Sequence, residues 1–325
     1  MASCPPLHPL TPPRGGAPPS LGTTALTDWV QVLRGLRQGC GMSPDFFNLY
    51  GETILRELEE VHEGLVVNGV QINNIRYADD TVFIATSEEG AQRITEIATA
   101  SGNRRGLNIN CKKTKVMCVS KQEPEPTFEL TIDNEIVEQV QVFNYLGAHI
   151  TANGDSKKEI KRRIGMSKDA FNKMKNIFTD RKLSMAVKVH LLKTFVWSIL
   201  LYGAEAWTLN AETRRNIEAA EMWYYRRILR ISYVDRITNI EVLRRVGKGR
   251  ELLNIIETKQ LKFLGHYIRK GKLEDLCLAG RIDGKRARGR PRKTYLNNFQ
   301  DRFQTTRELW DTARDRNEWC RVSDA

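Results

Sequence analysis

Two adjacent aspartates, Asp79 and Asp80, stand in the segment RYADDTVFIA at residues 76–85 and could hold a divalent cation. Apolar, β-prone residues flank the pair, so the segment predicts a strand, an acidic turn and a second strand. Carboxylate oxygens are the hard ligands that Mg²⁺ or Mn²⁺ accepts, and two such cations support nucleotidyl transfer. The simpler interpretation is a solvated hairpin tip, because acidic residues are common in turns.

Three further segments accompany the acidic pair along the chain. LRGLRQGCGMSPDFFNLY at residues 33–50 contains Gln38, which can reach a base edge, and Gly39, which lets a backbone approach closely. It leads into a helix start in which Ser43 can cap and Pro44 suits the first turn. GLNINCKKTK at residues 106–115 and FNYLG at residues 143–147 follow downstream.

In this order and spacing, the four segments resemble the reverse transcriptases of non-LTR (LINE-type) retrotransposons. The resemblance covers residues 30–155 by motif, and LYGAEAW at residues 201–207 with the basic helices beyond it is similar to the thumb of such proteins. It implies an RNA-directed DNA polymerase that extends a DNA primer on an RNA template with Mg²⁺ (or Mn²⁺). It also implies an α+β fold: a right-hand polymerase palm, with an incomplete antiparallel sheet and helices, followed by an all-α basic thumb and C-terminal region.

The resemblance assigns roles to matching positions. Asp79 and Asp80 correspond to the metal-binding and supporting carboxylates, and Lys113 to a lysine that serves the pyrophosphate. The segments that lie against the nucleotide and template correspond to Arg37, Gln38, Gly39 and Tyr77. The primer grip corresponds to Phe143, Tyr145, Leu146 and Gly147. Each has a structural alternative: the aromatic residues could belong to the core, and Lys113 could lie in a solvated turn.

The sequence departs from the family pattern before Arg37. The first metal aspartate of the family lies on a palm strand several dozen residues before the RQG segment, whereas only 36 residues precede Arg37 here. Asp28 is too near Gln38 to replace it, and the fingers segment that holds the triphosphate is missing. These differences predict an N-terminally truncated chain that is inactive alone and leaves an open edge beside the acidic hairpin.

The chain divides into five expected segments. Seven of the eleven prolines lie in the first 19 residues, so residues 1–25 are expected to be a disordered leader. Residues 26–154 are expected to form the partial palm, with hairpin turns at Asn68-Gly69 and Asp133-Asn134 and a helix at 88–101. Residues 155–280 are expected to form the helical thumb or connection, with helices around 184–203, 212–231 and 251–270. Its first part carries an apolar seam at helical spacing with one polar member, formed by Ile160, Ile164, Ser167, Phe171, Met174 and Phe178. A basic linker at 281–294 and a helical segment at 295–325 follow.

Charge separates the two halves of the chain. Residues 1–154 contain 12 Lys and Arg against 18 Asp and Glu, whereas residues 155–325 contain 39 against 21. The basic half favours a nucleic-acid partner first and an acidic membrane surface second, but no anchor segment favours the membrane. Six scattered cysteines without paired spacing predict neither disulfides nor a zinc site, and they favour an intracellular location.

Two basic or aromatic segments in the second half leave alternatives open. KRARGRPRK at residues 285–293 could follow the minor groove of A·T-rich DNA, or it could be a solvated linker that serves as a nuclear import signal. Its DNA-binding candidates are Arg288, Gly289, Arg290, Pro291, Arg292 and Lys293. EMWYYRRILRISY at residues 221–233 could stack on bases, but its helical spacing favours the core.

Three functions follow from these observations. The first is a LINE-type reverse transcriptase, at least by descent. The second is a non-catalytic nucleic-acid-binding remnant that uses the basic half. The third is a remnant without function. The oligomeric state, the template and the target site cannot be predicted from these residues.

Overall fold

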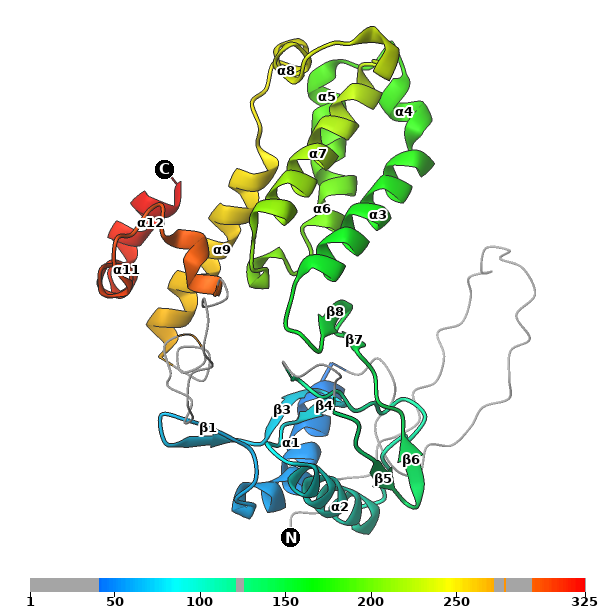
Figure 1. The fold of residues 1–325 in the computed structure, drawn as a ribbon, viewed down its shortest axis with the longest axis vertical. Coiled ribbons are helices and arrows are strands. Elements are labelled where there is room, and N and C mark those ends of the chain that lie inside the picture. The colour runs from blue at the N-terminus through cyan, green and yellow to red at the C-terminus, as the bar shows by residue number, and fades with distance from the viewer. Residues whose placement is uncertain (1–40, 121–125, 272–277, 279–293, 325) are drawn as a thin grey trace, which may run out of the picture. The chain divides into compact units, whose positions relative to one another are not determined.

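The computed structural model describes residues 41–120, 126–271, 278 and 294–324. By packing, the chain divides into Met1–Phe47 and Asn48–Ala325, and the elements below belong to the second unit except for the start of the first helix. Element labels follow Figure 1.

The described residues of the first half form four antiparallel hairpins. They are β1 (Leu65–Val67) with β2 (Val70–Ile72), β3 (Asn74–Tyr77) with β4 (Asp80–Phe83), β5 (Leu130–Ile132) with β6 (Glu135–Val137), and β7 (Val142–Tyr145) with β8 (Ala148–Thr151).

Local turn chemistry explains these hairpins. Asn68 and Gly69 have φ of 49° and 77°, and Asp133 and Asn134 have φ of 49° and 65°. Two positive φ angles in a two-residue loop match the type I′ turn, whose twist suits paired strands and which Asn, Asp and Gly adopt most readily. Both turns predicted from the sequence are therefore confirmed.

The hairpins do not join into the single incomplete sheet that the resemblance predicted. Among the described residues each hairpin is a separate two-stranded sheet. Strands of three or four residues offer few backbone groups for further pairing, and the hairpins are stabilised by side chains instead. Leu130, Ile132 and Val137 pack on Ala91 of α2 (Glu88–Arg104), so a helix takes the role that neighbouring strands would have.

The described helices have the following bounds. The α-helices are α1 (Ser43–Leu55), α2 (Glu88–Arg104), α3 (Lys157–Lys173), α4 (Lys175–Thr179), α5 (Met185–Leu191), α6 (Ser198–Leu200), α7 (Ala211–Ile228), α8 (Asn239–Val246), α9 (Leu252–Lys270), α11 (Thr306–Arg314) and α12 (Arg316–Asp324). Short 3₁₀ turns are η1 (Arg56–Glu60), η3 (Ala204–Ala206), η4 (Tyr233–Asp235) and η5 (Tyr295–Phe299), and a π-helical turn, η2 (Leu192–Trp197), joins α5 to α6.

The helices from α3 to the start of α9 share one apolar core. The seam predicted from the sequence is confirmed, since Ile160, Phe171 and Phe178 are fully buried. Its polar member, Ser167, lies 2.6 Å from the hydroxyl of Tyr224, so the buried groups satisfy each other. Tyr224 and the adjacent Tyr225 are fully buried in α7, as the helical spacing of the aromatic residues predicted.

A second, smaller core holds the C-terminal helices on α9 (Figure 1). Leu261 and Leu264 of α9 pack with Leu309 of α11 and Trp319 of α12. Trp319 donates its indole N–H to the carbonyl of Leu261 at 3.0 Å. None of the described helices has the length and apolar character needed to cross a bilayer.

Candidate functional site

The base of the β3–β4 hairpin is fixed in the interior, and this positions its tip. Asn73 is buried and donates its side-chain N–H to the carbonyl of Leu58 at 2.5 Å. The backbone N–H of Ile84, on the other side of the hairpin, donates to the carbonyl of Asn73 at 2.8 Å. Leu58 is fully buried and packs with Phe83 of β4. The acidic turn therefore projects from an anchored ribbon.

The tip of this hairpin presents both aspartates to solvent. Tyr77 and Asp80 are cross-strand partners, so Ala78 and Asp79 form the two-residue turn. Ala78 has φ of 51°, a conformation that costs a residue with a Cβ about 1–2 kcal/mol. Asp79 and Asp80 are exposed, and the Tyr77 ring is 63% exposed beside them. The predicted strand, acidic turn and strand are confirmed.

The FNYLG hairpin, β7 with β8, contains a buried hydroxyl group. The Tyr145 hydroxyl is buried and makes no hydrogen bond to the described part of the chain. Burial raises the pKa of Tyr145, and the negative charge of Asp80 raises this pKa further. The charge of Asp80 thus acts on a residue that the sequence placed in a separate motif.

The turn of the FNYLG hairpin is held by side chains of α3 and by Tyr202, which follows α6. Leu146 and Gly147 have φ of 48° and 76°, which again matches a type I′ turn. The Tyr202 hydroxyl donates to the carbonyl of Leu146 at 2.7 Å. Arg162 donates to the carbonyl of Gly147 at 3.2 Å, and Arg163 donates to the same carbonyl. The hairpin is therefore attached through its backbone, whatever its side chains contact.

A buried ion pair in α3 stabilises this attachment. Arg163 Nε lies 2.6 Å from Glu159 Oε1, and the two side chains are 7% and 4% exposed. Glu159 also accepts the backbone N–H of His149 of β8 at 2.9 Å, and the Arg163 guanidinium lies 4.4 Å from the centre of the Tyr202 ring. We call Glu159, Arg162, Arg163 and Tyr202 the hairpin clamp.

The charge state of the clamp follows from its contacts. Burial by itself raises the pKa of Glu159, but hydrogen bonds from Arg163 and the His149 backbone, with the charges of Arg163 and Arg162, hold the pKa below its ordinary value. Glu159 is therefore ionised at neutral pH and neutralises the buried guanidinium of Arg163.

The donor chemistry at the acidic turn suits one hard divalent cation. Mg²⁺ is commonly bound through one or two carboxylates, with water and substrate phosphates completing its shell, and Asp79 and Asp80 supply two carboxylates. Within the described ranges, no group of three or more Asp, Glu, His or Cys side chains is arranged to hold a metal ion. The two aspartates thus suit a cation that is coordinated jointly by the protein and the substrate, rather than a cation that protein side chains enclose.

The remaining predicted residues lie apart from this pair or outside the described residues. Lys113 is exposed in a turn, where its backbone N–H donates to the carbonyl of Asn110 at 3.1 Å. Phe143 is partly buried and pairs with Ile150 across the hairpin. The candidates Asp28, Arg37, Gln38, Gly39, Arg288, Gly289, Arg290, Pro291, Arg292 and Lys293 lie outside the described residues.

The hairpin clamp was not identified from the sequence. Its signal there is weak: Glu159 and Arg163 are four residues apart on a helix with the acid first, a spacing that favours an ion pair. Many surface pairs have this spacing, and the sequence does not indicate that this pair is buried. The contact of Tyr202 with Leu146 joins distant segments and has no local signal.

Comparison with known proteins gives consistent matches. A family described as reverse transcriptase (RNA-dependent DNA polymerase) matches residues 23–150. A putative uncharacterized transposon-derived protein of Caenorhabditis elegans is 30% identical over 271 residues, which cover 79% of this chain and 96% of that protein. Retrovirus-related Pol polyproteins from the type-1 retrotransposable element R2 are 27% identical over 37% of the chain in Nasonia vitripennis and 23% identical over 61% in Popillia japonica. The chain spans 12% and 28% of these two polyproteins.

Proposed function

The chain belongs to the reverse transcriptase family of non-LTR retrotransposons, and from this premise we propose that it is an RNA-directed DNA polymerase that extends a DNA primer on an RNA template. One observation carries the proposal. The acidic turn presents the carboxylates of Asp79 and Asp80 to solvent at the tip of an anchored hairpin, within the residues that match the reverse transcriptase family. Two exposed carboxylates held by paired strands can share a divalent cation with the phosphates of a nucleotide.

Asp79 and Asp80 would hold Mg²⁺ or Mn²⁺ at this site. Such a cation supplies charge neutralisation at the transferred phosphoryl group and activation of the attacking hydroxyl. Both aspartates are exposed at the tip of the hairpin, so phosphates and water can approach them without a rearrangement of the chain. The anchored base at Asn73 keeps the carboxylates in place while the substrate binds.

The FNYLG hairpin would position the primer. The Tyr145 hydroxyl is buried and has no hydrogen-bond acceptor among the described residues, so a sugar or phosphate oxygen must uncover it to accept its proton. The hairpin clamp fixes Leu146 and Gly147 through their carbonyls, so the backbone next to Tyr145 is held in one position. Tyr77 offers an exposed ring beside the turn. We assign the roles of Lys113, Arg37, Gln38 and Gly39 as the family motifs imply.

Extension by the chain alone is expected to be slow. The described residues place only two carboxylates at the turn, without a third acidic side chain that completes a metal cluster. Loss of one metal carboxylate costs several kcal/mol in the transition state, which is on the order of 10³-fold or more in rate. The assay must therefore detect slow turnover.

A primer-extension assay tests the proposal. A labelled DNA primer annealed to an RNA template is incubated with dNTPs, Mn²⁺ and excess protein for hours. Asp79→Asn should lower extension at least 10²-fold, because a metal ligand is lost while the turn keeps its shape. Asp133→Asn is the matched control, since Asp133 also lies in a two-residue hairpin turn, between β5 and β6. Extension that survives Asp79→Asn, or that falls equally with Asp133→Asn, would contradict the proposal.

A further inference from the structure

The end of α7 and the turn that follows it line an open groove of about 1060 Å³. Its cations are Lys175, Arg226, Arg227, Arg230 and Arg236, and no carboxylate lines it. No ion pair neutralises any of the five within the described parts of the chain. Positive charge gathered in a groove without counter-charges favours a polyanion. We call it the arginine groove.

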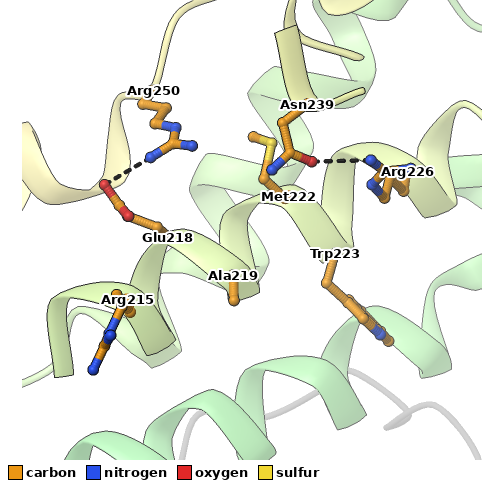
Figure 2. A pocket seen from close by; sticks show the side chains of 8 residues that line it. All are labelled: Arg215, Glu218, Ala219, Met222, Trp223, Arg226, Asn239 and Arg250. Carbon is orange, nitrogen blue, oxygen red and sulfur yellow. Dashed lines mark hydrogen bonds and ion pairs between the residues drawn. The ribbon is translucent and has the colours of Figure 1, made fainter. Parts of the chain in front are cut away.

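The walls of the arginine groove are fixed by contacts of its arginines, of which Arg226 is half-buried and Arg227 is exposed. Arg226 donates to the carbonyl of Ile237 at 2.7 Å and to the side chain of Asn239 at 2.9 Å, as Figure 2 shows for the second contact. The Arg227 guanidinium lies 4.2 Å from the centre of the Trp223 ring. The groove thus has preordered cations, which bind phosphates with less loss of conformational entropy than free side chains do.

A second, smaller hollow of about 430 Å³ adjoins the arginine groove and is also lined by Trp223 and Arg226 (Figure 2). It adds Arg215 and Arg250, of which Arg250 forms an ion pair with Glu218 at 2.8 Å. The basic surface therefore continues along α7 and is longer than one phosphate group requires.

An aromatic ring projects from the groove into solvent. Tyr233 is 97% exposed, although a tyrosine ring in a soluble protein is usually covered at least in part. It lies in η4, whose cap is closed by hydrogen bonds between Ser232 and Asp235, so the backbone that carries the ring is ordered. The same contact occupies the carboxylate of Asp235, the acidic residue of this turn. An exposed ring beside cations is the arrangement that stacks on unpaired bases.

We propose that the arginine groove binds a single strand of nucleic acid, with the backbone phosphates on the arginines and a base on Tyr233. Phosphate contacts alone would fit any polyanion, but the exposed ring favours a partner with unpaired bases over an acidic protein or an anionic membrane. RNA and single-stranded DNA share this chemistry. The site is separate from the acidic turn, so the inference does not depend on polymerase activity.

Fluorescence anisotropy with the full chain tests this inference. The probes are 20-nucleotide oligo(U) and oligo(dT), labelled at one end, with a 20-base-pair duplex for comparison, at several KCl concentrations. Arg230→Asn/Arg236→Asn removes two cations, and asparagine suits the φ of 56° and 48° at these positions. We expect at least tenfold weaker binding of both single strands. The slope of log K against log salt should flatten by about 1.4, because each phosphate contact contributes about 0.7.

Matched variants separate this site from general attraction by net charge. Arg307→Gln/Arg314→Gln removes the same charge from exposed positions on α11 and should change binding less than twofold. Tyr233→Ala should weaken single-strand binding about tenfold with the salt slope unchanged, whereas Tyr233→Phe should bind as the wild type does. Because Tyr233 is 97% exposed, its replacement does not threaten the fold.

The result that would overturn the inference is equal weakening by the two double variants, or no effect of Tyr233→Ala. Binding of poly-L-glutamate or phosphatidylserine vesicles that depends on Arg230 and Arg236 to the same extent would also overturn it. Photo-crosslinking of 4-thiouridine-containing oligo(U) to the wild type gives a measurement without mutation. Crosslinks should map to residues 223–237, and crosslinks found only elsewhere would overturn the site. Asp79→Asn should retain this binding even where it abolishes extension.

Discussion

Replacing Glu159 by glutamine removes the charge that neutralises the buried Arg163 and should loosen the FNYLG hairpin. The two side chains are 4% and 7% exposed and approach to 2.6 Å. Removing one partner of a buried ion pair costs about 3–5 kcal/mol, because the other charge is left without compensation. Glutamine can still accept one hydrogen bond, and the Tyr202 ring at 4.4 Å still faces the guanidinium. We therefore expect about 3 kcal/mol, the lower end of that range.

Hydrogen exchange followed by mass spectrometry measures this effect where it occurs. Peptides that cover residues 142–151 should exchange about 10²-fold faster in Glu159→Gln, since 1.4 kcal/mol corresponds to a factor of ten. Glu241→Gln is the control, because Glu241 pairs with Arg244 and Arg245 at the surface and solvent screens these pairs. Equal exchange of the hairpin in both variants would refute the clamp.

The same charge makes the hairpin sensitive to acid. The pKa of Glu159 in the folded protein lies below its ordinary value of 4.5, so its stabilisation is present above pH 4.5 and is lost as the pH falls through the folded pKa. Protection of residues 142–151 should therefore decrease in that window in the wild type. In Glu159→Gln this decrease should be absent, and an identical acid profile in both proteins would contradict the assignment.

Three further predictions concern other parts of the chain. Burial raises the pKa of Glu221 above 4.5, so the stability that its protonated form contributes is lost as the pH rises through the folded pKa. Glu221→Gln should therefore reduce the change in urea midpoint between pH 4.5 and pH 8. A change in midpoint as large as that of the wild type would contradict this. A Cβ on Gly265 would overlap the Trp319 indole, so Gly265→Ala should release α12 to proteolysis, whereas Gly249→Ala, with open space around it, should not. Ala78→Gly should slow hydrogen exchange in the β3–β4 hairpin by relieving the positive φ, with a gain of up to about 1 kcal/mol; faster exchange would count against strain at Ala78.

Local features of the fold followed from the sequence. The turns at Asn68-Gly69 and Asp133-Asn134 were predictable because only a few residue types adopt positive φ readily. The identity of the two turn residues is therefore sufficient to indicate each turn. The helical seam was predictable because burial repeats with the period of the helix, as Ile160 and Phe171 illustrate.

Contacts between distant segments could not be predicted in the same way. The sequence placed Asp80 and Tyr145 in two motifs, but only the structure shows that the charge of one affects the pKa of the other. The burial of the Glu159 and Arg163 pair depends on β8, which precedes α3, and on α6, whose Ile199 lies 36 residues from Arg163 along the chain. The sequence assigned Arg230 and Tyr233 to a core segment, because helical spacing predicts burial for all of residues 221–233. In the structure α7 ends at Ile228, and both residues line the arginine groove.

The separation of the hairpins also had no sequence signal. Alternating strands predict pairing within each hairpin through its turn, but the order of hairpins in a sheet depends on long-range backbone contacts. Outside the named strands, the described residues form one isolated β-bridge, between Val116 and Gln139. The palm and thumb designations for these regions accordingly stay predictions from the family resemblance.

Paramagnetic NMR tests the central claim, that the acidic turn and the FNYLG hairpin form one metal-dependent site, most directly and without requiring turnover. The nine tyrosines are labelled with ¹³C at Cζ, and Mn²⁺ is added below one equivalent. Mn²⁺ held by Asp79 and Asp80 should broaden the signals of Tyr77 and Tyr145 while leaving that of the buried Tyr225 unchanged, and Asp79→Asn should abolish the broadening. If Tyr145 is not broadened, or is broadened equally in Asp79→Asn, the two motifs do not form one site.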